Sequence, residues 1–347
     1  MRVLILGGGV CLGWHLADVA RARGWQVTSF RRGTTPATTP AGVETVFGDR
    51  RRDLGRLEGR TWDVVYDCCG YRPEVVAQSC ETLRAAVGRY CFVSSVLAYA
   101  DLSAESLHET MPAHEVAVDA GAELNASNYG PLKAACEREV RASLGTKASI
   151  VRPGYLIGPR DRSARMARWV RRSLRGGDVL LPEPAGRPWQ FIDVRDAAEL
   201  MASDGVVGTE AMWNVAGPAS VSPGLPLLHR VLAHGGTRHT ITACSTDILR
   251  AAGAEAILDQ ADWAVLPETE RGSYAMNVDA ALAAGLRIRP LETTLADIHA
   301  EIGLRQSGPG SLADGAEYDR LEALTAARLN DTYKLRGVRT KHELGAT

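Results

Sequence analysis

Short apolar runs alternate with amphipathic segments through the first 156 residues of the chain. A short apolar run bounded by turn residues predicts a buried strand, and an apolar stripe with helical spacing predicts a helix. The predicted strands span 2–6, 26–30, 43–47, 63–69, 90–95 and 148–156, and the predicted helices span 12–24, 73–88 and 129–144. Strands that are apolar on both faces and alternate with helices favour an α/β fold with a doubly wound parallel sheet, the Rossmann fold.

After residue 156 this alternation ends. A predicted helix at 162–175, a proline-rich link at 182–188 and mixed segments follow. We therefore expect a first domain at 1–156 and a smaller C-terminal substrate-binding region at 157–310, interleaved with it. A C-terminal helix and tail are expected at 311–347. Because ligands of doubly wound sheets bind beyond the carboxyl ends of the strands, functional residues are expected at those ends.

The composition excludes several classes of protein. The 347 residues carry a formal net charge of −1, so no global field attracts nucleic acid or an anionic membrane. The apolar runs are well short of a membrane span. Seven cysteines without paired C-x-x-C spacing predict buried thiols rather than disulfides or a metal site. We expect a soluble cytoplasmic protein with a small-molecule substrate and no nucleic-acid or membrane partner, and a homodimer is left open.

The stretch "GGGVCLG" at 7–13 follows the first predicted strand and opens the first helix. Glycines in that context let the backbone approach a pyrophosphate, and the helix N-terminus adds N–H groups and a positive dipole end. The glycines satisfy a G-x-G-x-x-x-G count, although glycines also serve tight turns. Val10 stands where many such loops have glycine, and we expect it to alter the width of the loop. The expected cofactor contacts are Gly7, Gly9, Val10, Cys11, Leu12 and Gly13.

Arg31 and Arg32 stand at the end of the second strand, where an NAD-selective protein usually has an acidic residue for the ribose 2′-hydroxyl. An arginine there can clamp a 2′-phosphate or stack on adenine, and the alternative is a pair of solvated loop arginines. The charge favours NADPH over NADH, with NAD as the second choice. Asp49, after the third strand, is a candidate acceptor for the adenine amine or a turn residue beside Gly48.

"NYGPLK" places Tyr129 four residues before Lys133, so on a helix the two side chains share a face. A neighbouring ammonium lowers the pKa of a phenol, which can then give a proton to a carbonyl oxygen as hydride arrives. Alone, this spacing is more often a surface helix pair. The glycine loop, the presence of only four lysines in the chain, and the serine pair Ser94–Ser95 at the end of the preceding strand strengthen the catalytic interpretation.

These motifs together resemble the extended short-chain dehydrogenase/reductases of the NAD-dependent epimerase/dehydratase kind, in a branch with a GGTRFLG-like loop. The resemblance covers residues 1 to about 300 and includes "GDRR", "VRPGYLIGP" and "FIDVRDAAEL". It implies Ser95, Tyr129 and Lys133 as the catalytic triad, with Lys133 also bonding the nicotinamide ribose. Sugar 4,6-dehydratases of this family carry Asp-Glu after the catalytic hydroxyl. Because Val96 and Leu97 stand there and cannot move protons, dehydration by that route is not expected.

Further candidates lie near the ends of the fourth and sixth strands and in the C-terminal region. Cys69 and Gly70 are expected to face the cofactor, and Tyr155 to border the nicotinamide, with ordinary strand packing as the alternative. The candidate substrate contacts are Tyr71, Ser95, Tyr129, Arg165, Arg187 and Gln190. Arg165 begins a basic helix face with Arg168, Arg172 and Arg175, for which solvation is the commoner explanation. Asp193 and Asp196 are expected to fix their loop through Arg195 or backbone N–H groups.

The leading hypothesis is an NADPH-dependent reductase that transfers hydride to a ketone of a small polyhydroxylated substrate, a sugar or a sugar-derived natural-product intermediate. A second hypothesis is a nucleotide-sugar epimerase that retains NAD. A third is a non-catalytic nucleotide- or RNA-binding relative with the same fold. The complete Ser95, Tyr129 and Lys133 set and the lack of net basic charge argue against the third.

Overall fold

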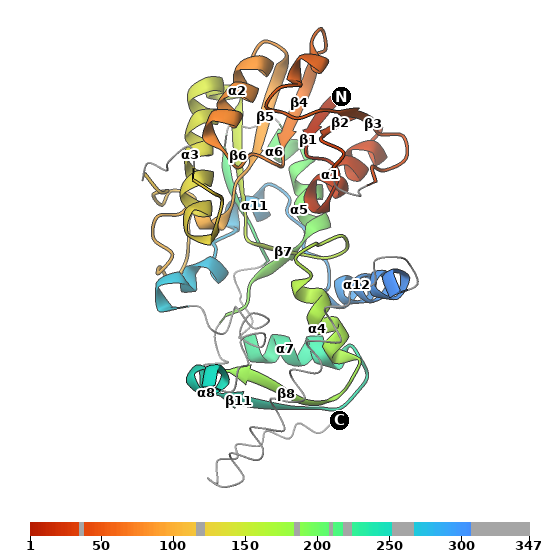
Figure 1. Ribbon diagram of the computed structural model, residues 1–347, viewed down its shortest axis with the longest axis vertical. Coiled ribbons are helices and arrows are strands. Elements are labelled where there is room, and N and C mark those ends of the chain that lie inside the picture. Colours follow the sequence, from red (N-terminus) through yellow and green to blue (C-terminus); the bar gives the residue numbers. More distant parts are fainter. Residues whose placement is uncertain are drawn as a thin grey trace.

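The computed structural model describes residues 1–34, 38–115, 122–183, 188–207, 211–217, 224–251 and 267–306. Seven parallel strands form the main sheet, in the order β10-β6-β5-β4-β1-β2-β3. Their bounds are β1 (Arg2–Leu6), β2 (Gln26–Arg31), β3 (Glu44–Phe47), β4 (Trp62–Asp67), β5 (Val87–Val93), β6 (Ala148–Pro153) and β10 (Met212–Val215). The prediction of an α/β protein with a Rossmann-like parallel sheet is confirmed (Figure 1).

Helices cover both faces of this sheet (Figure 1). One face carries α1 (Cys11–Ala22) and α5 (Val194–Met201), and the other carries α2 (Pro73–Leu83) and α3 (Ala126–Leu144). Strand β1 shows why the strands are apolar throughout. Val3 and Ile5 pack beneath α1 and α5, whereas Leu4 and Leu6 pack beneath α2 and α3, so successive side chains enter two different cores.

A second apolar core lies beyond the carboxyl ends of the sheet, in the lower part of Figure 1. It is built around α4 (Arg165–Ser173), α7 (Gly224–Ala233) and α12 (Leu291–Gln306), with a two-stranded sheet of β8 (Gly177–Pro182) and β11 (His239–Cys244). A further pair joins β7 (Tyr155–Ile157) to β9 (Phe191–Asp193). The shorter helices are α6 (Asp204–Val207), α8 (Thr246–Ala251) and α11 (Asp279–Ala283). The expected C-terminal helix and tail at 311–347 lie outside the described residues.

Some predicted element bounds are wrong. The sixth strand does not run from 148 to 156, because β6 ends at Pro153 and β7 begins at Tyr155 in another sheet. Gly154 makes this turn possible, since a Cβ there would lie 3.2 Å from both Ala216 and Met276. The fourth strand ends at Asp67, so Cys68 and Cys69 belong to the following loop instead of the strand. The second helix ends at Leu83, well before 88, because β5 begins at Val87.

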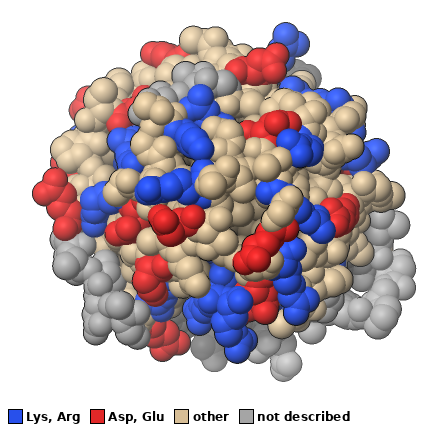
Figure 2. All heavy atoms as spheres, turned by 90° about the horizontal axis from the view of Figure 1, so that it is seen from above, with Lys and Arg blue, Asp and Glu red and all other residues tan. Residues whose placement is uncertain are grey.

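The surface seen from above the sheet carries both signs of charge (Figure 2). Basic and acidic side chains alternate there over short distances, so this face presents no field of a single sign. No helix within the described ranges is both long and apolar enough to cross a membrane.

A buried ion pair fixes α3 against the sheet. Arg152 of β6 donates from Nε and Nη2 to the two carboxylate oxygens of Glu137 on α3, at 2.8 and 2.6 Å. The guanidinium also lies 4.2 Å from the ring centre of Tyr99, whose hydroxyl donates to Asn214. Because both charges are almost inaccessible to solvent, removal of one leaves the other without compensation.

We expect Glu137→Gln to lower the free energy of unfolding by about 3–5 kcal/mol, since it leaves the Arg152 guanidinium buried without its anion. Urea unfolding followed by circular dichroism measures the change. The control is Glu292→Gln, which breaks the exposed pair with Arg230 and should cost less than about 1 kcal/mol. Equal losses in the two variants would contradict the prediction.

Candidate active site

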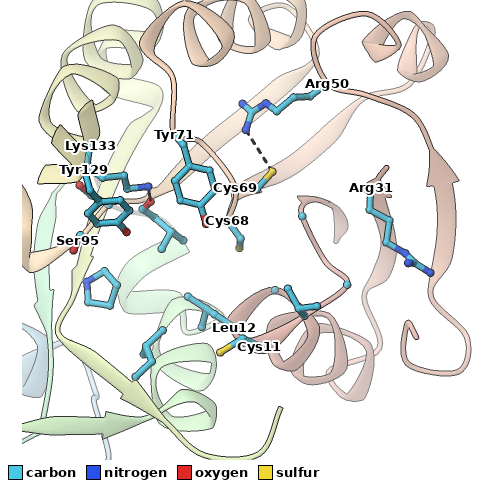
Figure 3. Close-up of a pocket in the computed structure, with 18 of the residues that line it drawn as sticks. Cys11, Leu12, Arg31, Arg50, Cys68, Cys69, Tyr71, Ser95, Tyr129 and Lys133 are labelled. Atoms are coloured by element: carbon cyan, nitrogen blue, oxygen red, sulfur yellow. Dashed lines mark hydrogen bonds between the residues drawn. The ribbon is translucent and has the colours of Figure 1, made fainter. Parts of the chain in front are cut away.

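A cavity of about 830 Å³ lies at the carboxyl ends of the strands of the main sheet. Its wall includes the loop after β1, the ends of β2 and β3, the loop after β4, the end of β5, the first turns of α3 and the segment from Pro153 to Arg165. Figure 3 shows how these side chains converge from segments that are far apart in the sequence. This is the edge of the sheet where the sequence predicted the functional residues.

The glycine loop forms one end of the cavity, and two of its glycines are required by close backbone packing. Gly7 has a φ of +93°, and a Cβ there would lie 2.8 Å from the Cβ of Cys69. A Cβ on Gly13 would lie 2.5 Å from the carbonyl oxygen of Gly7. Val10, which is 37% exposed, precedes α1, and no side chain caps the helix N-terminus. The free N–H groups and positive dipole end at that N-terminus suit a phosphate.

The predicted adenosine end of the cavity is rich in arginine. Arg31 lies over the ring of Phe47 at 5.0 Å, and its Nε is buried with no hydrogen-bond partner among the described residues. Arg32 is exposed beside it, and both line the cavity. Asp49 also lines the cavity, while its carboxylate accepts from the N–H of Arg51, so it has the turn geometry as well. The cradle of glycines and the unpaired guanidinium nitrogen fit a phosphorylated dinucleotide.

Ser95 and Tyr129 lie next to each other in the cavity wall, on the side away from Arg31 (Figure 3). Ser95 begins a short 3₁₀ turn, η2 (Val96–Ala98), and its oxygen accepts from the N–H of Leu97 at 3.2 Å. Tyr129 lies near the start of α3, which Asn125 and Asn128 cap reciprocally. Burial raises the pKa of the Tyr129 phenol above its usual value, and a hydrogen bond with Ser95 partly offsets this.

Lys133 lies on the same helix as Tyr129, and backbone carbonyl groups hold its ammonium. Its buried ammonium donates to the carbonyl oxygens of Gly70 at 2.8 Å and Val93 at 2.5 Å. It contributes no resolved lowering of the Tyr129 pKa, for which burial is the dominant cause. The expectation that Lys133 lowers this pKa stays a prediction, and the structure shows that the ammonium is oriented by the two carbonyl groups. Lys133 nevertheless lines the same cavity as Ser95 and Tyr129.

Gly130 permits the approach of α3 to the turn after β5. A Cβ at this position would lie 2.0 Å from the carbonyl oxygen of Leu97, much closer than any side chain allows. The contact brings the residue after Tyr129 against the turn that Ser95 begins. Sequence reasoning did not single out Gly130, although a glycine inside a predicted helix is a signal of close packing.

The buried pair of Arg50 and Asp67 was also missed. Arg50 donates to both carboxylate oxygens of Asp67, at 2.7 and 2.8 Å, and its Nη1 lies 3.5 Å from the Sγ of Cys69 (Figure 3). Arg50 lines the cavity, and Asp67 lies fully buried at the end of β4. A carboxylate ending an otherwise apolar central strand was the signal that could have found this pair.

Most of the remaining predicted residues line the cavity. Tyr71 lies beside Tyr129, with ring centres 6.3 Å apart, and Arg165 lies 5.2 Å from the ring centre of Tyr155, which stacks on Tyr274. Tyr71, Tyr155 and Arg165 all line the cavity, as do Cys11, Leu12 and Cys69. Gly9 lines it too, whereas Gly70 contributes its carbonyl group to Lys133.

Gln190 lies apart from the cavity, which contradicts its prediction as a substrate contact. It is buried, and its amide bonds the backbone of Gly217 and Met276, so its hydrogen-bonding groups are used structurally. Arg187 lies outside the described residues.

The basic helix face and the acidic pair are also partly structural. Arg172 is buried and donates to the carbonyl groups of Gly176 and Asp178, so it is neither solvated nor directed at a ligand. Asp193 accepts from the N–H and the guanidinium of Arg195, as expected. Asp196 accepts from the backbone N–H of Arg289, which is one of the expected kinds of bond, and also from its guanidinium.

Comparison with known proteins places this geometry among related folds and sequences. Residues 73–203 match the model of the NAD dependent epimerase/dehydratase family. A 2′-dehydrokanamycin reductase of Streptomyces kanamyceticus is 29% identical over 221 residues. That alignment covers 59% of this chain and spans 59% of the length of the relative.

Two solved structures show the same fold. UDP-glucuronic acid 4-epimerase from Bacillus cereus, in complex with UDP-glucuronic acid and NAD, superposes with a TM-score of 0.62 at 15% identity, covering 88% of this chain and 99% of that one. MoeE5, in complex with UDP-glucose and NAD, gives a TM-score of 0.62 at 18% identity, covering 88% of this chain and all of that one. At these identities the likeness concerns the fold.

We expect Gly130→Ala to reduce turnover at least about tenfold, because the added methyl group forces α3 away from Leu97 and separates Tyr129 from Ser95. Steady-state kinetics with a substrate found by screening measures the change. Gly303→Ala is the matched control, since that helical glycine has open space around it and should keep its activity. A Gly130→Ala protein with unchanged kinetics would show that the close contact does not position the site.

Proposed function

We propose that this chain, a member of the NAD-dependent epimerase/dehydratase family, is an NADPH-dependent reductase. Its substrate would be a small polyhydroxylated ketone, a sugar or a sugar-derived natural-product intermediate, and Tyr129 would be the general acid. The observation that carries the proposal is that Ser95, Tyr129 and Lys133 line the same cavity as the glycine loop, with Ser95 acting on the Tyr129 phenol.

The protonation state of Tyr129 suits reduction. When bound, NADPH would supply a hydride to the carbonyl carbon. Burial keeps the Tyr129 pKa above its usual value, so the phenol holds its proton at neutral pH and can give it to the carbonyl oxygen. Ser95 is placed to share a hydrogen bond with that oxygen. Lys133, held by the carbonyl groups of Gly70 and Val93, supplies a positive charge in the same wall.

Arg31 and Arg32 support the choice of NADPH. Each lines the cavity at the end of β2, where a dinucleotide places its adenosine ribose. Positions 30–34 are Phe, Arg, Arg, Gly and Thr, so they hold no acidic residue for a ribose 2′-hydroxyl. The buried, unpartnered Nε of Arg31 would gain an acceptor from a 2′-phosphate.

The substrate class is supported by the cavity wall and by one relative. Tyr71 and Tyr155 offer aromatic faces for a sugar ring, and Arg165 and Ser163 offer polar groups for hydroxyls. The relative from Streptomyces kanamyceticus is, by its name, a reductase of 2′-dehydrokanamycin. Dehydration remains disfavoured, because Val96 and Leu97 in the cavity wall carry no proton-transfer group.

An epimerase is the second candidate, favoured by the nucleotide-sugar epimerases among the similar folds. Such an enzyme oxidises and reduces the same carbon and therefore keeps its NAD bound throughout. Cofactor released from the purified protein by heat distinguishes the two. Retained NAD would support epimerisation, whereas an exchangeable NADPH consumed with keto-sugars would support net reduction. Binding of dinucleotide with no turnover on any such substrate would favour a non-catalytic relative.

Tyr129→Phe should lower turnover by about 10²- to 10⁴-fold, because only the proton donor is lost. Dinucleotide binding, followed by fluorescence titration of NADPH, should persist. Ser95→Ala should also lower turnover, whereas Ser94→Ala is a matched control, since the Ser94 hydroxyl has no hydrogen-bond partner among the described residues. Unchanged turnover in Tyr129→Phe would refute the acid role.

Replacing Arg31 and Arg32 together with alanine should weaken NADPH binding by about 10- to 100-fold and change NADH binding little, because only NADPH carries the 2′-phosphate. Titration calorimetry with both cofactors measures this. Arg141→Ala, at an exposed position in the last turn of α3, controls for the loss of surface charge. Equal weakening of both cofactors would dismiss the phosphate clamp.

A further inference from the structure

The carboxylate of Asp67 lies buried beneath the wall of the cavity and binds the guanidinium of Arg50. Asp67 has no exposed surface, and its oxygens accept from both Nη atoms of Arg50, from the Tyr90 hydroxyl at 2.8 Å and from the N–H of Cys69 at 3.2 Å. Four donors satisfy a carboxylate well. The surrounding groups therefore stabilise Asp67 in its charged form despite complete burial.

Lys133 occupies an equally enclosed position on the other side of the same loop. Its ammonium lies 4.5 Å from the ring centre of Phe92 and 5.1 Å from that of Tyr71, and its two acceptors are backbone carbonyl groups. These neutral partners orient the ammonium but do not neutralise it. An ammonium enclosed in this way loses its proton unless an anion lies close by.

Two carboxylates favour the charged form of Lys133, Asp67 in the sheet below and Glu137 on α3. Glu137 follows it by one helical turn, but Arg152 binds both of its oxygens. Asp67 favours the charged form of Lys133 more strongly than Glu137 does. The other titratable groups around the ammonium are Cys136 on α3 and Cys69 and Tyr71 in the loop after β4. Burial raises the pKa of all three, so they are neutral at ordinary pH.

Asp67 is also linked mechanically to Lys133. It accepts from the N–H of Cys69, and the next residue, Gly70, gives its carbonyl group to the ammonium. Gly70 is held in place on all sides, because a Cβ there would lie 2.5 Å from Phe92, 2.8 Å from Val76 and 3.0 Å from Asp67. The loop that orients the ammonium is thus anchored on the carboxylate. Figure 3 shows Cys69 and Tyr71 of this loop, together with Arg50 and Lys133.

We propose that Asp67 is the counter-ion of Lys133, a positioning residue that keeps the ammonium charged and oriented within the wall of the cavity. Arg50 binds the same carboxylate and thereby weakens the stabilisation of the charged Lys133. The loop contacts of Cys69 and Gly70 carry this relation, and it does not depend on the proposed function. Its consequence for catalysis rests on the proposed function, in which Lys133 supports Tyr129.

The chain offers a direct test, because it has only four lysines, at 133, 147, 334 and 341. Full-length protein labelled with ¹³C at the lysine Cε atoms gives few signals, and Lys133→Met identifies the one of interest. We expect Asp67→Asn to lower the pKa of Lys133 by on the order of one unit or more, because the counter-ion is removed. Arg50→Met should raise it, because the carboxylate then acts on Lys133 alone.

Glu137→Gln is the comparison variant and should lower the Lys133 pKa less than Asp67→Asn does. A larger fall in Glu137→Gln, or an unchanged pKa in Asp67→Asn, would overturn the proposal. If Asp67→Asn does not fold, Arg50→Met decides, since Asp67 keeps Tyr90 and Cys69 as donors there. In that variant an unchanged or lower Lys133 pKa would count against the shared carboxylate.

The pH profile of turnover then tests the catalytic consequence separately. If charged Lys133 supports Tyr129, the alkaline limb of kcat should move to lower pH in Asp67→Asn and to higher pH in Arg50→Met, in step with the NMR titrations. A merely structural role would lower kcat without opposite movements of the limb. Shifted NMR titrations with an unmoved kcat profile would uphold the counter-ion and reject the role of Lys133 in the proposed function.

Discussion

The contact between helix α3 and the short turn after β5 is the constraint on which the rest of the site depends. Position 130 has no side chain, so the helix backbone packs directly against the carbonyl group of Leu97. This approach brings Tyr129 and Ser95 into the wall of one cavity, although they come from different elements. The buried Arg152–Glu137 pair holds the same helix to β6 further along its length. The catalytic geometry is thus set by backbone packing and by a buried ion pair behind the site.

The sequence predicted the sheet and the place of the site because both follow from local patterns. Apolar runs marked each strand of the first 156 residues, and the glycine loop lay where a strand passes into a helix. Gln190 and Arg172 were harder, because a polar side chain before a buried strand or on a helix face has the same appearance in sequence whether it contacts a ligand or backbone carbonyl groups. Only the path of the neighbouring segments decides between these roles.

The electrostatics of the site could be predicted least. The spacing of Tyr129 and Lys133 correctly placed them on one helix, but spacing does not give the direction in which the ammonium points. Arg50 follows β3 and Asp67 ends β4, so their ion pair forms only in the folded protein. Its electrostatic effect on the cavity therefore could not be predicted from local sequence. Burial raises the pKa of Tyr129 and lowers that of Lys133, and burial is a property of the complete fold.

The passage from β6 to β7 has a consequence for how ligands are discriminated. Gly154 alone separates a central strand of the main sheet from a strand of the outer region, and its N–H is bonded to Val215. At this crossing there is no linker that could act as a hinge, so Tyr155 has a fixed height above the sheet. Selection between molecules of similar size at this wall therefore rests on the shape and polarity of individual side chains. Exchange of residues along the outer region can change which molecule fits the cavity while the glycine loop and the helix α3 beneath stay unchanged.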